Sequence, residues 1–137
     1  MKGRTRVNRL LILAPMPVVM LTVICCLGAG GKANVRLTAA FKNAPPSARK
    51  QQNPYQGKAS AVLAGEKLFR RYCAQCHDNN ESYKRGPNLH STVVQKKPAG
   101  VLYWFLKNGK PREGMPSWRG LPSQQRWQLI TYLKSLH

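Results

Sequence analysis

Cys73-Ala74-Gln75-Cys76-His77 is the most informative segment of this 137-residue chain. Two thiols three positions apart, on a chain that is just leaving a helix, can form thioethers with the two vinyl groups of one haem. The adjacent His77 then lies under the iron as its proximal ligand. This C-x-x-C-H spacing is typical of c-type haem attachment. We therefore predict one covalent haem c held by Cys73 and Cys76, with His77 as an iron ligand.

Three other uses of the two thiols fit the sequence less well. A structural disulfide between Cys73 and Cys76 suits an exported chain but leaves His77 unexplained. A thioredoxin-like redox pair needs a strand in a βαβ context, and nothing in the sequence alternates with a period of two. Structural zinc needs four ligands, and the remaining histidines, His90 and His137, give a spacing that matches no standard zinc pattern.

A second signal for haem lies at Gly114-Met115-Pro116. Thioether sulfur is a soft, neutral iron ligand, and His/Met ligation raises the reduction potential. Pro116 biases Met115 toward an extended backbone, and Gly114 lets the loop approach the porphyrin closely. A buried methionine more often fills a core than binds a metal. Met115 is, however, the only methionine beyond residue 33, and we predict it as the second axial ligand.

The remaining patterns predict an all-α domain with long loops. Apolar residues recur with a helical period in three segments, residues 60–72, 98–108 and 122–136. Pro98 suits the first position of the second helix, and Gly109 is placed to end it. We expect these three main helices and their loops to wrap around one haem.

Residues 1–33 are expected to lie outside this domain. A basic start is followed by an uncharged run over residues 10–31, which is the pattern of a Sec signal peptide. The same run could be an uncleaved membrane anchor, because a spanning helix needs about 20 residues. Residues 34–57, rich in Pro, Gln and Lys/Arg, are expected to form a flexible linker, and residues 58–137 the folded domain.

The charge is strongly basic, at +19 for the whole chain. Beyond residue 33 the chain has 18 Lys and Arg residues and four Asp and Glu residues, which gives this part a net charge of +14. Such a charge favours anionic partners, and we expect acidic redox proteins. Nucleic acid is disfavoured, because the basic residues are scattered and the chain is exported. Several flank the elements expected to form the exposed haem edge, namely Lys84, Arg85, Lys110, Arg112 and Arg119.

In these features the chain resembles class I cytochrome c, across nearly all of residues 58–137. The marks of that family appear in order: Gly65 with Phe69, Cys73-x-x-Cys76-His77, Gly86-Pro87-Asn88-Leu89, Gly114-Met115-Pro116 and the Leu129–Lys134 segment.

The resemblance implies roles for residues outside the haem motif. Gly65 should let the first and last helices cross at close range, with Phe69 near Tyr132. Pro87 should offer its carbonyl to the ring N–H of His77 and so fix the orientation of the imidazole. His90 could be taken for a rival ligand, but we expect it at the surface near the proximal side.

The function implied is electron transfer rather than catalysis. His77 and Met115 would fill both axial positions of the iron. We expect a periplasmic electron carrier or haem subunit that passes single electrons between a dehydrogenase and an oxidase or another cytochrome. The alternative is a haem peroxidase or ligand-binding haem protein in which Met115 is labile.

Overall fold

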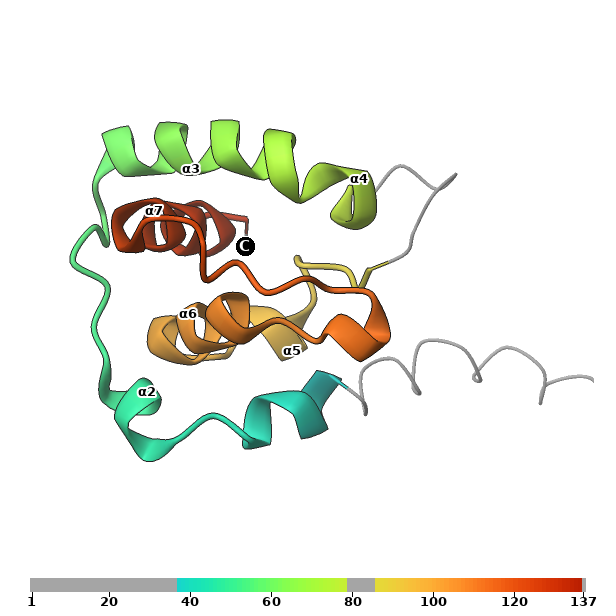
Figure 1. Ribbon diagram of the computed structural model, residues 1–137. Coiled ribbons are helices and arrows are strands. Elements are labelled where there is room, and N and C mark those ends of the chain that lie inside the picture. The colour runs from blue at the N-terminus through green and yellow to red at the C-terminus, as the bar shows by residue number, and fades with distance from the viewer. Residues whose placement is uncertain (1–36, 79–85, 137) are drawn as a thin grey trace, which may run out of the picture.

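A computed structural model describes residues 37–78 and 86–136 of the chain. The leader or anchor expected over residues 1–33, and the basic residues Lys84 and Arg85, lie outside the described residues. Within the described residues, helices are joined by loops and no strand is formed (Figure 1), which confirms the all-α prediction. No helix in this part of the chain is long and apolar enough to cross a membrane.

The three predicted helices form close to their expected positions, as α3 (Ala59–Tyr72), α6 (Ala99–Asn108) and α7 (Ser123–Leu133). Pro98 caps α6 with an extended backbone, and Gly109, at a φ of +63°, ends it. The last helix stops three residues before the expected Leu136. Two one-turn helices, α4 (Ala74–His77) and α5 (Thr92–Gln95), and the 3-10 turn η2 (Pro111–Glu113) lie in the loops.

Helices α3 and α7 lie side by side and cross with almost no space between them (Figure 1). A β-carbon at Gly65 would lie 2.1 Å from the backbone oxygen of Gln128. One turn further along, the rings of Phe69 and Tyr132 have centroids 5.3 Å apart. The structure thus confirms the close crossing at Gly65 and the packing of Phe69 on Tyr132.

The prediction of a flexible linker over residues 34–57 is wrong for residues 37–50. Residues 37–42 are helical, and α2 (Pro46–Lys50) follows them. We call residues 37–50 the N-terminal strap, and it runs along α6 (Figure 1). The physical reason is a helical spacing of apolar side chains that become buried: Leu37, Ala40, Phe41, Ala44 and Ala48.

The strap is packed tightly against the rest of the domain. A β-carbon at Gly100, in the first turn of α6, would lie 2.1 Å from the backbone oxygen of Ala48. Beyond the strap, the side-chain amide of Asn53 donates to Thr131 Oγ1 of α7 at 2.9 Å, and both residues are buried. The folded unit therefore begins no later than residue 37.

The crossing of α3 and α7 can be tested with one added methyl group. Gly65→Ala should lower the free energy of unfolding by about 1–3 kcal/mol, because the new β-carbon overlaps backbone atoms that a rotamer change cannot move. Gly120→Ala is the matched control, since a β-carbon there meets no heavy atom within 4 Å. Both free energies are measured by chemical denaturation. Equal stability of the two variants would contradict the crossing.

Candidate haem site

The two thiols lie at the junction between α3 and α4. The chain turns at Cys73, whose φ of −120° and ψ of −35° end the long helix. The carbonyl of Cys73 then accepts the N–H groups of Cys76 at 3.1 Å and of His77 at 3.0 Å, which starts the single turn of α4. Residues three apart on such a turn share one face, and the two thiols are not bonded to each other. Of the two, Cys73 lines the pocket described below, and Cys76 is not among the lining residues.

The pKa of Cys73 argues against a thioredoxin-like redox pair, and the placement of the possible metal ligands argues against structural zinc. Burial raises the pKa of the Cys73 thiol to about 11, and the neighbouring Cys76 acts in the same direction. Redox-active thiols need the opposite shift, to a pKa below that of free cysteine. Among residues 37–78 and 86–136, no three His, Cys, Asp or Glu side chains gather to hold a metal ion, so the described residues offer no zinc site.

The imidazole of His77 is held from behind by the Gly86-Pro87 turn. Nδ1 lies 3.0 Å from the carbonyl oxygen of Pro87, and because a carbonyl only accepts, Nδ1 carries the proton. Nε2 is then left with a free lone pair, as a metal ligand requires. A β-carbon at Gly86 would lie 2.5 Å from His77 Cε1, so only glycine lets the turn approach the ring this closely.

Met115 reaches the site from a separate loop. Its N–H donates to the Lys110 carbonyl at 3.2 Å and its carbonyl accepts the Lys110 N–H at 2.9 Å, which makes a small antiparallel bridge around η2. Gly114 closes this turn at a φ of +87°, in the left-handed region that favours glycine. The extended backbone expected from Pro116 is thus present, and it is fixed by two hydrogen bonds.

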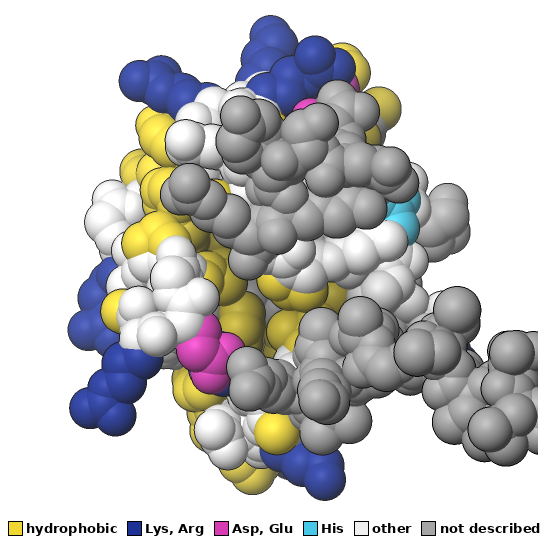
Figure 2. All heavy atoms as spheres, turned by 90° about the vertical axis from the view of Figure 1, so that its right-hand side faces the viewer, with side chains coloured by type: hydrophobic (Ala, Val, Ile, Leu, Met, Phe, Trp, Pro, Cys, Tyr) yellow, Lys and Arg dark blue, Asp and Glu magenta, His cyan; other side chains and the backbone are white. Residues whose placement is uncertain are grey.

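An apolar pocket lies between the segment that carries His77 and the segment that carries Met115. Figure 2 shows apolar side chains in the hollow on the face that bears the opening. Apart from the imidazole of His77, the lining side chains are apolar or carry sulfur: Leu37, Phe41, Phe69, Cys73, His77, Pro87, Leu89, Val94, Leu102, Phe105, Leu106, Met115, Leu129, Ile130 and Leu133.

The residues present therefore fit a haem. The lining is apolar, as a porphyrin requires, and Cys73, His77 and Met115 are all part of it. Trp118 and His90 lie outside the lining of the pocket. Trp118 packs on Tyr72, with ring centroids 5.3 Å apart, and is not among the lining residues. His90 is exposed, and its Nδ1 lies 2.8 Å from the carbonyl oxygen of Leu136, so it is a surface residue as expected.

Sequence reasoning missed the part of the lining that comes from the N-terminal strap, Leu37 and Phe41. Their signal was present as the spacing Leu37, Phe41, Ala44, Ala48, which repeats every three or four residues. Alanine contributes weakly to such a pattern, and the Pro45-Pro46 pair in its middle resembles a linker.

Comparison with known proteins gives consistent matches. The family described as cytochrome C oxidase, cbb3-type, subunit III matches residues 60–133. The cytochrome c of Gossypium barbadense is 41% identical over 122 residues, covering 70% of this chain and 96% of that protein. The cytochrome c of Ginkgo biloba is 31% identical over 122 residues, covering 70% and 95%. No solved structure matches significantly.

Proposed function

Because the chain belongs to the c-type cytochrome family, we propose that it carries single electrons on the periplasmic side of a bacterial cell envelope. Members of the family transport electrons through covalent haem c and are not enzymes. The donor and acceptor proposed here are a dehydrogenase on one side and an oxidase or another cytochrome on the other. Residues 1–33 would direct export, either as a cleaved signal or with residues 10–31 kept as an anchor.

The observation that carries this proposal is that His77 and Met115 line the same apolar cavity from two separate segments. We assign His77 and Met115 as the axial ligands, and Cys73 and Cys76 as the thioether residues. When bound, the haem supplies an iron that is reduced and reoxidised by one electron. The carbonyl oxygen of Pro87 accepts a hydrogen bond from His77 Nδ1, so that the imidazole keeps one tautomer and one orientation.

The remaining residues of the site keep the coordination unchanged during electron transfer. Met115 is held by its bridge to Lys110, and His77 by Gly86 and Pro87. The apolar walls exclude water from the cavity. If His77 and Met115 both ligated the iron, the site would suit a carrier, whereas the peroxidase alternative would need Met115 to leave and open a position for substrate.

Charge around the cavity supports an acidic redox partner. The turn that carries Met115 also carries Lys110 and Arg112, and Arg119 follows it. Lys110 forms an ion pair with Glu113, so its charge is partly neutralised. Arg112 and Arg119 are exposed. We propose that these two arginines orient an acidic partner toward this face.

Covalent attachment is the first test. Protein made in a host that matures cytochromes should carry one haem per chain that survives denaturing electrophoresis, because thioether bonds do not break on unfolding. Cys73→Ala combined with Cys76→Ala should abolish this retention. Intact mass reports haem number and leader removal together. Complete release of haem from the parent protein by acid acetone would contradict the proposed function.

Met115→Ala tests the second ligand. The ferric parent should show the weak far-red absorption band of a sulfur–iron bond, and the variant should lose it entirely. Its reduction potential should also fall, because a neutral thioether ligand favours the reduced state. Absorption spectra and redox titration measure both effects. An unchanged spectrum and potential would mean that another residue ligates the iron.

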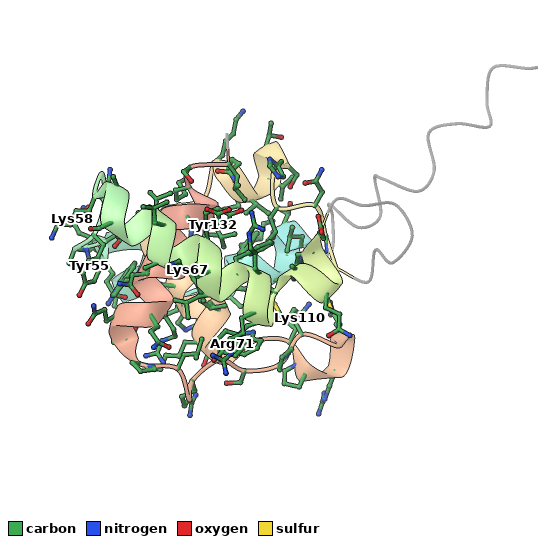
Figure 3. All side chains as sticks on the ribbon, turned by 90° about the horizontal axis from the view of Figure 1, so that it is seen from above. Tyr55, Lys58, Lys67, Arg71, Lys110 and Tyr132 are labelled. Carbon is green, nitrogen blue, oxygen red and sulfur yellow. The ribbon has the colours of Figure 1, made fainter. Side chains whose placement is uncertain are left out.

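The proposed docking face predicts a local charge effect. Arg112→Glu with Arg119→Glu should slow electron exchange with ferrocyanide, an anionic complex, by about tenfold at low salt, because steering charges are reversed. Lys50→Glu with Lys58→Glu is the control of equal net charge. Figure 3 shows Lys58 at the opposite end of the molecule from Lys110.

The rates are measured by stopped-flow absorption across a range of ionic strengths. The difference between the two double variants should shrink as the Debye length falls to about 8 Å near 0.15 M salt. Equal slowing by both pairs of substitutions would show that only net charge matters, and docking at this face would be ruled out.

A further inference from the structure

We propose that the N-terminal strap, residues 37–50, is a wall of the haem site, and that Phe41 and Leu37 keep water from the cofactor and thereby raise its reduction potential. The proposal rests on haem binding as argued above. It gives a role in the electron-transfer reaction to a segment outside the matching family region, which begins at residue 60.

Phe41 lies between the cavity and the outer surface of the domain. It lines the cavity while only 3% of its surface is exposed. Its ring packs on Phe105, another lining residue, with centroids 5.0 Å apart and planes tilted by 58°. The ammonium group of Lys97 lies 5.6 Å from the centre of the same ring. The ring of Phe41 therefore lies between the cavity and the charged group of Lys97.

Leu37 extends this wall by one helical turn. It also lines the cavity and is 9% exposed. Residues four apart on a helix lie on the same face, so Leu37 and Phe41 present adjacent apolar side chains to the cavity.

The strap is held in place by contacts that do not involve the cavity. The backbone of Ala48 meets Gly100 so closely that a β-carbon on that glycine would overlap it. Asn53, three residues beyond the strap, donates to Thr131 in α7. The strap is thus fixed at its C-terminal end, and Phe41 is held further along it by its ring contact with Phe105.

The physical effect follows from charge. Oxidised haem iron carries one more positive charge than reduced iron, and an apolar surrounding disfavours the more highly charged state. The hydrophobic shell around a metal site therefore controls its potential through solvent access and local dielectric. Opening the wall at Phe41 would admit water from the side of Lys97, stabilise the oxidised state and lower the potential.

The experiment compares full-length variants in redox titrations. Phe41→Ala should shift the ratio of oxidised to reduced protein at a fixed ambient potential by roughly tenfold toward oxidised, which for one electron is about 59 mV. Phe41→Leu, which keeps the cavity apolar and filled, should retain most of the parent potential. The far-red sulfur band should persist in both, because Met115 is untouched.

Val101→Ala is the matched control. Val101 is fully buried in α6 but does not line the cavity. This substitution should lower the free energy of unfolding without changing the potential. If Phe41→Ala does not accumulate, Leu37→Ala tests the same wall and should give a smaller shift in the same direction.

The outcomes separate the two proposals. A parent protein without covalent haem would contradict the proposed function itself. A parent with haem c and the sulfur band, but with Phe41→Ala and Leu37→Ala matching Val101→Ala in potential, would contradict the role of the strap alone. The role of the strap is supported if Phe41→Ala lowers the reduction potential more than Phe41→Leu does, and if Val101→Ala leaves it unchanged.

Discussion

The backbone carbonyl of Gln128 occupies the space that a side chain at Gly65 would need, so α3 and α7 are locked at one distance and angle. The haem motif depends on this contact, because Cys73 and His77 continue directly from the end of α3. Leu129 and Ile130, which are almost fully buried in α7, form the facing wall of the cavity. The crossing therefore sets the position of the attachment residues relative to the surface on which the cofactor must pack.

The lining of the pocket is apolar apart from the imidazole of His77, so a group that packs against it removes apolar surface from water. Small domains often supplement a limited core with a metal or another buried group. Here the apolar face of a haem would complete the core, and attachment through Cys73 and Cys76 would keep that missing part permanently in place. Folding and cofactor binding are then coupled, because the haem would form part of the core. The strap adds to that core from outside the region that the family matches.

Sequence alone predicts the parts of the site that depend on local spacing. The Cys73–His77 motif, the bounds of α6 at Pro98 and Gly109, and the placement of Met115 toward the cavity all follow from neighbouring residues. The strap does not, because its alanines give a weak apolar signal and Pro45-Pro46 interrupts it. The bond that fixes it, between Asn53 and Thr131, joins residues 78 positions apart, and no local pattern reveals such a contact.

The shortage of acidic residues shapes both the interior and the surface. In the described part of the chain, Glu66 pairs with Arg70 and Glu113 with Lys110. Arg126 is buried, and its guanidinium instead donates to the carbonyls of Trp118, Arg119 and Leu121 and to Tyr103 Oη at 2.9 Å.

Those carbonyls belong to the loop between Met115 and α7. A buried arginine that donates to backbone carbonyls therefore braces the segment that carries Met115, without using a carboxylate. Beyond residue 33 the chain has 18 Lys and Arg against four Asp and Glu, and this brace uses none of those four carboxylates.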